Sequence, residues 1–370
     1  MQRILIAPDK FKGSLSAPTV AETIAAELGT AFLGIEIDSC PIADGGEGTA
    51  EALITAKNGH WVECATVDAQ NRPLTAKYGL IGSREAVMEM SSASGLALVS
   101  DLPLDPARAS THGTGLMMQD AQQRGTQRII IGIGGSATND GGTGMARALG
   151  FRFLDAEGRE LENLPAELDR LQSIAAPEKR PVEVLVACDV TNPLLGPQGC
   201  TRVYGPQKGV RDFEWFESRL ARLEAVVKRD LGVDAAEIPG AGAAGGLGYG
   251  LMAFCGAKLT SGFDLIAEII GLKARIAAAD LVITGEGKLD AQTLHGKGPM
   301  GVAEMARSMG KPVIGIGGVI EARKELQSRF EALFQVKPDS LPVAEAMKKG
   351  RELLRAATRE QLVPWLQNRA

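Results

Sequence analysis

The chain has 370 residues, of which 45% are apolar, 23% charged and 4% aromatic, and its formal net charge is −5. The acidic balance and the scarcity of aromatic residues argue against a nucleic-acid partner, because such surfaces are normally basic and often stack bases on aromatic rings. No apolar run reaches the roughly 18 residues of a membrane span, and the N-terminus lacks a signal-peptide pattern, so we expect a cytoplasmic protein without a membrane partner.

Strands and helices alternate at the N-terminus. Apolar runs at 4–8 and 35–42 predict two strands, and helical patterns follow them at 16–29 and 49–57. This βαβα alternation is typical of a parallel sheet with covering helices.

The same alternation returns near the C-terminus. Strands are predicted at 280–287, 312–318 and 332–338, with helices between them, and a long helix is predicted from about Val343. With the two N-terminal strands they make five parallel strands of a doubly wound sheet.

The middle of the chain has a mixed pattern. Runs at 61–67, 73–81 and 85–90 alternate apolar and polar residues, which predicts an antiparallel meander. Further strands are predicted at 128–133 and 182–190, with helices at 114–124 and from Gly144.

We therefore predict an α/β protein with two domains, since single cores rarely extend beyond about 300 residues. Residues 1–60 and 278–370 form the doubly wound parallel-sheet domain. Residues 61–277 form a second, mixed α/β domain inserted into the first.

The stretch GIGGSATNDGGTG at 132–144 follows a predicted strand and allows two interpretations. In the first, Gly132, Gly134 and Ala137 match a dinucleotide-binding motif, and Asp155 supplies the ribose-binding carboxylate about 20 residues on. This is the hypothesis of an NAD-dependent dehydrogenase acting on a small hydroxy acid. Against it, the third small residue of that motif normally lies in the helix, whereas here helix-breaking residues prolong the loop.

The second interpretation is phosphate binding, since glycine loops present backbone N–H groups without side-chain obstruction. The sequence contains no GxxxxGK[ST] motif, which excludes a P-loop NTPase. Asp140 is suited to orienting a metal ion or its water. The candidate residues of this loop are Gly134, Gly135, Ser136, Thr138, Asn139 and Asp140.

Charged and polar residues follow several predicted strands, at the edge where open α/β sheets bind ligands. Carboxylates, lysines and glycines together are the groups that phosphoryl transfer with magnesium requires. Cations neutralise charge, backbone N–H groups bind phosphate, and a carboxylate orients the attacking hydroxyl. The residues concerned are Asp9, Lys10, Lys12, Ser14, Asp44, Glu47, Asp189, Asn192, Glu286, Lys288 and Asp290.

The five cysteines and three histidines show no metal or catalytic pattern. There is no CxxC pair and no pair of histidines at zinc-ligand spacing. A GxSxG motif is also missing from the sequence, which excludes the usual α/β-hydrolase.

Eight motifs in register, from about residue 3 to beyond residue 318, resemble the bacterial glycerate kinase family. They are APDKFKGSLSA, PIADGGEGT, EMSSASGL, GIGGSATNDGG, VACDVTNPL, GPQKG, PGAGAAGGLG and VITGEGKLDAQT. The resemblance implies phosphorylation of D-glycerate by ATP with Mg²⁺, at the 2-hydroxyl, giving 2-phosphoglycerate. It also implies a flavodoxin-like domain interrupted by a second α/β domain. A substrate cleft at the interface of two domains would predict closure on binding. The GTG turn at 113–115 precedes Leu116, where the family commonly has Glu.

Individual roles are hypotheses from residue chemistry. Asp189 is the candidate base, and Lys10 and Lys12 are expected to contact phosphate oxygens or the glycerate carboxylate. The candidate magnesium ligands are Asp44, Glu47 and Asp290. The remaining substrate- and nucleotide-binding candidates are Asp9, Ser14, Ser94, Asn192, Glu286, Lys288, the 134–140 loop, and Gly242, Gly245 and Gly246 of the second glycine loop. A metabolite sensor without catalysis is a rival, but it would not need several strand-end carboxylates.

Overall fold

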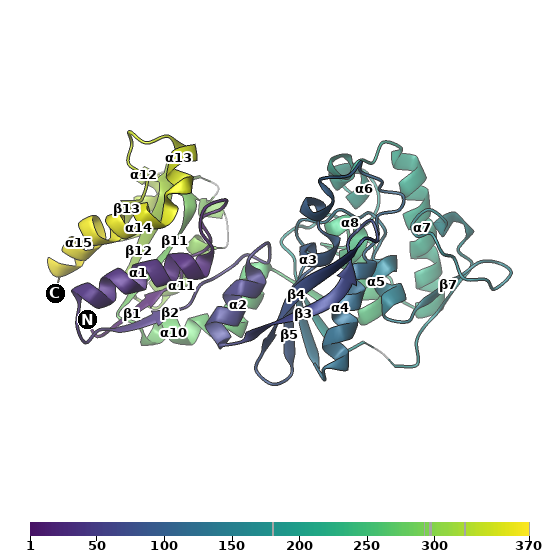
Figure 1. The fold of residues 1–370 in the computed structure, drawn as a ribbon, viewed down its shortest axis with the longest axis horizontal. Helices are drawn as coiled ribbons and strands as arrows, with labels where there is room; N and C mark the ends of the chain where they lie inside the picture. Colours follow the sequence, from purple (N-terminus) through teal and green to yellow (C-terminus); the bar gives the residue numbers. More distant parts are fainter. Residues whose placement is uncertain (180, 292, 296–297, 322, 370) are drawn as a thin grey trace. The chain divides into compact units, whose positions relative to one another are not determined.

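The computed structural model describes the chain except residues 180, 292, 296, 297, 322 and 370 (Figure 1). The described residues divide by their contacts into two compact units. Unit 1 comprises Met1–Asp44, Glu51–Asn58 and Phe263–Ala370, and unit 2 comprises Gly45–Ala50 and Gly59–Gly262. Residues 263–277 therefore share contacts with unit 1, whereas the inserted domain predicted from the sequence extends to residue 277. The domain boundaries stay a prediction.

Unit 1 contains a five-stranded parallel sheet among the described residues, in the order β13-β12-β11-β1-β2. Counted along the chain from the β2 edge, this is the 2-1-3-4-5 order of flavodoxin-like folds. The five predicted parallel strands are confirmed. They are β1 (Arg3–Ile6), β2 (Glu36–Ser39), β11 (Leu281–Leu289), β12 (Val313–Ile320) and β13 (Ala332–Gln335).

Helix α1 (Ala17–Ala31) illustrates how unit 1 covers its sheet. Its N-cap Ser16 accepts a hydrogen bond from the Thr19 backbone N–H, and its buried face includes Val20 and Ile24. That face joins a core formed with the strands and with α14 (Gly350–Ala357). Helices α1 and α14 lie side by side (Figure 1). The other helices of unit 1 include α2 (Thr49–Lys57), α9 (Gly262–Ile269), α10 (Leu272–Ala278), α11 (Pro299–Ser308) and α12 (Arg323–Gln327).

The prediction of a long C-terminal helix from about Val343 is confirmed in part, because the segment is helical but is interrupted at Lys349. The segment divides into α13 (Val343–Lys348), α14 (Gly350–Ala357), a π-helical turn at Thr358–Leu362 and α15 (Val363–Gln367). The Ser14 hydroxyl donates to the Met347 carbonyl at 2.7 Å, which gives the end of α13 a partner outside the helix.

Unit 2 contains a six-stranded mixed sheet among the described residues, in the order β10-β9-β6-β5-β4-β3. The predicted antiparallel meander is confirmed, because β3 pairs with β4 and β4 with β5 in antiparallel register. From β5 to β10 the neighbours are parallel. The strands are β3 (His60–Val67), β4 (Pro73–Ile81), β5 (Glu85–Glu89), β6 (Arg128–Gly132), β9 (Glu183–Ala187) and β10 (Lys258–Thr260).

The helices of unit 2 enclose one large apolar core against this sheet. The longest, α7 (Phe213–Leu231), begins at the N-cap Asp212 and ends at Gly232 in the left-handed conformation. Unit 2 also contains α3 (Ser91–Ser94), α4 (His112–Gln123), α5 (Thr143–Ala148), α6 (Cys200–Tyr204), α8 (Ala243–Cys255), and a separate antiparallel pair, β7 (Arg152–Leu154) and β8 (Ser173–Ala175). In the described part of the chain, no helix has the length and apolarity that crossing a membrane requires.

Candidate active site

Carboxylates gather at the carboxyl ends of the unit 1 strands. Asp9 follows β1, Asp44 follows β2, and Glu286 lies in the last part of β11. Burial, and then the charge of Asp44, raise the pKa of Asp9 to about 6, although the Lys10 backbone N–H donates to its carboxylate at 2.7 Å. The sheet thus places acidic groups close enough together to disfavour full ionisation.

Glu286 has the same character. Burial raises its pKa to about 7, with further contributions from the charges of Asp9, Asp290 and Asp44. The Thr293 hydroxyl donates to Glu286 at 2.8 Å and partly opposes the shift. A cation beside these carboxylates would relieve their repulsion.

Lysines lie in the same unit. Lys10 Nζ is 3.9 Å from Asp44 Oδ1, and Lys288 pairs with Asp290 at 3.4 Å and with Glu321 at 2.9 Å. Lys12 is exposed, and its backbone passes close to Gly287 of β11.

These unit 1 carboxylates suit magnesium as oxygen donors. No group of three or more His, Cys, Asp or Glu side chains arranged to hold a metal is found among the described residues. Magnesium in nucleotide sites commonly uses one or two carboxylates together with phosphate oxygens and water. The grouping of Asp9, Asp44 and Glu286 at this edge, where burial and mutual repulsion raise the pKa of Asp9 and Glu286, is therefore what favours a cation here.

In unit 2, the loop 132–144 leaves β6 with its first part exposed and its second part buried. Gly134 and Gly135 are exposed, and Ser136 is largely buried and bridges to Gly95. The exposed glycines leave room for a ligand against the backbone.

Asp140 holds the buried half of this loop. Its carboxylate accepts hydrogen bonds from the backbone N–H and hydroxyl of Thr111, at 2.8 and 2.7 Å, and from the N–H groups of Gly142 and Gly144, both at 3.1 Å. Burial raises the pKa of Asp140, and these hydrogen bonds oppose the shift. Its direct contact with a nucleotide stays a prediction.

The two preceding residues, Thr138 and Asn139, are fully buried. The Asn139 side-chain amide donates to the Thr201 hydroxyl at 3.0 Å, and the Thr138 carbonyl accepts from Lys208 Nζ at 2.7 Å. Asn139 Oδ1 and Thr138 Oγ1 have no hydrogen-bond partner among the described residues.

The second glycine loop packs directly on the first. The Gly141 N–H donates to the Gly245 carbonyl at 3.0 Å, and the Gly242 N–H donates to the Asn192 carbonyl at 2.9 Å. A Cβ at Gly245 would lie 1.9 Å from the Thr138 carbonyl oxygen, and Gly245 has a φ of +68°. Only glycine allows this approach of two backbones.

The loop after β9 completes this edge of the unit 2 sheet. Asp189 is exposed, and its Oδ1 accepts from the Gly262 N–H at 3.1 Å. The Asn192 side chain is held by Tyr204, whose hydroxyl donates at 2.6 Å, and it donates to the Gln198 carbonyl at 2.8 Å.

Glu47 and Ser94 lie at the same edge. Glu47 is exposed on the stretch 45–50, which Glu89 anchors by accepting from the N–H groups of Gly48 and Ala50 at 2.9 and 3.0 Å. Ser94 is buried and shares a 2.8 Å hydrogen bond with the Thr114 hydroxyl.

Sequence reasoning did not single out Thr111, Lys208, Glu89 or Thr293. Lys208 and Glu89 lie in GPQKG and EMSSASGL, two of the motifs that carry the family resemblance, and Thr111 lies just before the GTG turn at 113–115; this proximity was the available signal. Their partners lie tens of residues away in the sequence, apart from Thr293, whose partner Glu286 is seven residues away.

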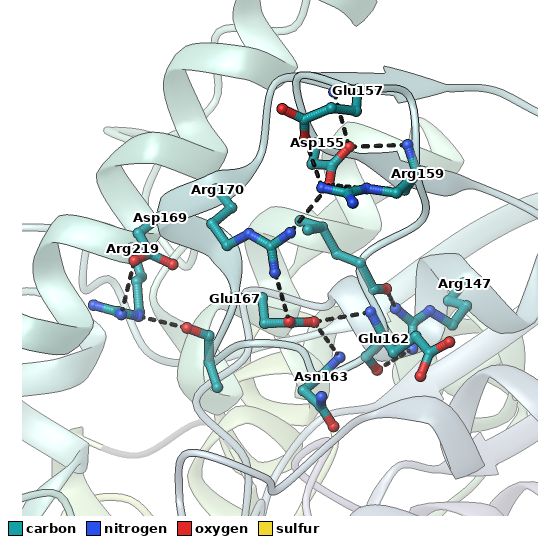
Figure 2. A network of polar contacts seen from close by, with 12 residues as sticks. Arg147, Asp155, Glu157, Arg159, Glu162, Asn163, Glu167, Asp169, Arg170 and Arg219 are labelled. Carbon is teal, nitrogen blue, oxygen red and sulfur yellow. Dashed lines mark hydrogen bonds and ion pairs between the residues drawn. The ribbon is translucent and has the colours of Figure 1, made fainter.

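The structure does not support the dinucleotide interpretation. Asp155 follows β7, which pairs with β8 and does not belong to the sheet of β6. Its carboxylate lies between the guanidinium groups of Arg159 and Arg170, each at 3.0 Å, and also accepts backbone N–H bonds (Figure 2). Asp155 is therefore committed to a local ion-pair network and not placed beside a ribose site.

Comparisons with known proteins agree on one family. A model described as "Glycerate kinase family" matches residues 4–366. The chain is 42% identical to "Glycerate kinase" of Bacillus subtilis (strain 168) over 97% of this chain and 96% of that protein. It is 44% identical to "Glycerate 2-kinase" of Escherichia coli (strain K12) over 85% of each. A crystal structure of putative glycerate kinase 2 from Salmonella typhimurium LT2 superposes with a TM-score of 0.89 at 41% identity, covering 99% of this chain and 98% of that one.

Proposed function

This chain belongs to the glycerate kinase family and is a kinase, and on that premise we propose that it transfers the γ-phosphoryl group of ATP to D-glycerate. The acceptor is the 2-hydroxyl, and the products are 2-phosphoglycerate and ADP. The 44% identity to the Escherichia coli protein named glycerate 2-kinase is the observation that carries this choice of hydroxyl.

The glycine loops of unit 2 are the proposed phosphate site. The backbone of Gly134 and Gly135 is exposed. The backbone of the second loop packs so closely on neighbouring backbone that a Cβ would clash at Gly242, Gly245 and Gly246. Backbone N–H groups without Cβ atoms surround phosphate oxygens with donors. The rigid packing of the two loops supports donors that are already oriented before the nucleotide binds.

Asp189 is the proposed base for the substrate hydroxyl. It is exposed at the end of β9, and the hydrogen bond from the Gly262 N–H to Oδ1 orients its carboxylate. A carboxylate in this role accepts the hydroxyl proton as the oxygen attacks phosphorus in line with the leaving ADP.

Magnesium is the proposed cofactor, with Asp44, Glu47 and Asp290 as candidate ligands. The neighbouring carboxylates Asp9 and Glu286, whose pKa values are raised, add to the attraction for a cation. When bound, the ion would neutralise charge on the phosphate oxygens. Lys10, Lys12 and Lys288 are proposed to bind the remaining phosphate oxygens or the glycerate carboxylate.

An assay of ADP release with ATP, Mg²⁺ and D-glycerate tests the proposal, followed by phosphorus NMR of the product. A 2-phosphoglycerate signal is the expected result. A 3-phosphoglycerate signal would contradict the choice of hydroxyl and leave the kinase activity intact. Release of ADP no faster than in the glycerate-free control would contradict glycerate as the acceptor.

A further inference from the structure

Lys208 is a buried lysine that the proposed mechanism does not use. It lies in the short 3₁₀ helix Pro206–Lys208, directly after α6, and its side chain is only 1% exposed. Lysine is almost never fully buried without a partner, because its ammonium loses water. Its burial at this position therefore indicates a specific role.

The partner of Lys208 is the glycine loop. Nζ donates to the Thr138 carbonyl at 2.7 Å across 70 residues of sequence. In the neighbouring α6, the Thr201 hydroxyl accepts from Asn139, so one segment binds two consecutive loop residues. The same Thr138 carbonyl faces Gly245 of the second glycine loop. Lys208 thus holds the atom at which the two loops meet.

The charge of Lys208 also matters at this point. Burial lowers the pKa of Lys208 to about 8, against opposing effects of Cys200 and Asp140. The ammonium form therefore predominates at neutral pH. A positive charge beneath a loop that binds phosphate adds to the favourable potential of the loop N–H groups, and it is weakly screened because it is buried.

We infer that Lys208 is a positioning residue for phosphoryl transfer, which acts by fixing the Thr138 carbonyl and so the donor geometry of both glycine loops toward the nucleotide phosphates. It does not itself touch the nucleotide. The inference rests on the proposed function in one respect, namely that these loops bind the phosphates.

Two substitutions separate positioning from folding. Lys208→Met keeps the length and apolar stem but removes the donor, and Lys208→Gln keeps an N–H donor without charge. Lys228→Met is the matched control, because Lys228 is exposed on α7 and pairs only with Asp234 among the contacts described for it. The measurements are Tm and steady-state kinetics with ATP and D-glycerate varied separately.

For Lys208→Met we expect kcat/KM for ATP to fall about 100-fold, because misplacing a reacting group by about 1 Å can slow a reaction by that factor. The KM for D-glycerate stays within about twofold and Tm stays close to that of the parent protein, while Lys208→Gln recovers part of the loss. Kinetics equal to those of Lys228→Met would overturn the inference. So would a loss shared equally by both substrates together with a large fall in Tm, since that result indicates a structural role.

If Lys208→Met does not fold, Lys208→Gln decides by the same criteria, and failure of both to fold overturns the inference. If the parent protein itself does not turn over D-glycerate, the proposed function fails separately. Binding of ADP, measured by calorimetry, then tests Lys208. Affinity at least about tenfold weaker in Lys208→Met supports positioning, and equal affinity overturns it.

Discussion

Carboxylates lie at or after the carboxyl ends of β1, β2 and β11 in unit 1, whereas the loop after β6 in unit 2 presents mainly glycine backbone and neutral hydroxyls. In unit 1, Asp9 and Glu286 share a neighbourhood that raises both pKa values. In unit 2, the carboxylate of Asp140 accepts hydrogen bonds from N–H groups of its own loop and from Thr111. The two sheets therefore present different chemical groups at the carboxyl ends of their strands.

The two strand edges differ in how they affect the stability of the folded protein. A carboxylate edge such as that of unit 1 destabilises the folded protein until a cation binds. A backbone edge such as that of unit 2 carries little charge and depends on close packing. Substitutions that change charge are therefore expected to have the larger effect in unit 1. Substitutions that change side-chain size are expected to have the larger effect in unit 2.

The largest effect is expected from Gly245→Ala. The new Cβ would lie 1.9 Å from the Thr138 carbonyl oxygen, at a φ of +68°. We expect the free energy of unfolding to fall by about 4 kcal/mol, within the range of severe single substitutions. Kinase turnover should fall with it, because the two glycine loops separate. Urea denaturation and the ADP assay measure both.

Gly256→Ala is the control for Gly245→Ala. Gly256 lies just after α8 with a φ of +63°, and a Cβ there meets nothing within 4 Å. The substitution should cost about 1 kcal/mol, for backbone strain only. Equal losses in the two variants would show that loop packing contributes nothing beyond that strain.

Asp189→Asn should act on chemistry with little effect on folding. Asparagine keeps an oxygen that accepts from the Gly262 N–H, so Tm should stay unchanged. Loss of the proposed base should lower kcat about 100-fold or more. Asp169→Asn is the control, since Asp169 is an exposed residue that pairs with Arg219. Near-normal kcat in Asp189→Asn would remove this residue from the mechanism.

Asp9→Asn should stabilise unit 1 at alkaline pH. The pKa of Asp9 rises from 3.8 to about 6 on folding, so the folded state binds the proton more tightly. Stability is then lost as the pH rises between these values. At pH 8 the variant should be about 3 kcal/mol more stable than the parent, and at pH 3 the two should be alike.

Denaturation curves at both pH values measure this difference, with Asp169→Asn as the exposed control. A variant that is less stable than the parent at pH 8 would show that the carboxylate of Asp9 is a net stabiliser in this unit. Its repulsion with Asp44 would then be too weak to support the cation site.

The smallest effect on activity is expected from Asp155→Asn. Burial raises the pKa of Asp155, but hydrogen bonds from Arg159 and Glu157 outweigh it and hold the pKa below its ordinary value. The substitution should lower Tm modestly, because Arg159 and Arg170 lose their shared partner. The kinetic constants should stay within about twofold, as for most changes away from a site. Loss of nucleotide binding would contradict the separation of Asp155 from the site.

The sequence predicted the regular parts of the fold well. Alternation of apolar runs with helical patterns located the parallel strands of unit 1, and period-two runs located the meander of β3, β4 and β5. These signals are local, because the side of a strand or helix on which a side chain lies is set by its spacing from its neighbours in the sequence. The break in the C-terminal helix at Lys349 was not predicted; next to it Ser14, more than 300 residues away in the sequence, donates to the Met347 carbonyl.

By itself, the sequence determined where the parallel strands lie along the chain, the glycine-rich loops and the family to which the chain belongs. Tertiary structure decided which groups meet. It directed Asp155 into an ion-pair network, raised the pKa values of Asp9 and Glu286, and brought Lys208 to the Thr138 carbonyl. Local periodicity is written in adjacent residues, whereas burial and long-range hydrogen bonds exist only once distant segments pack together.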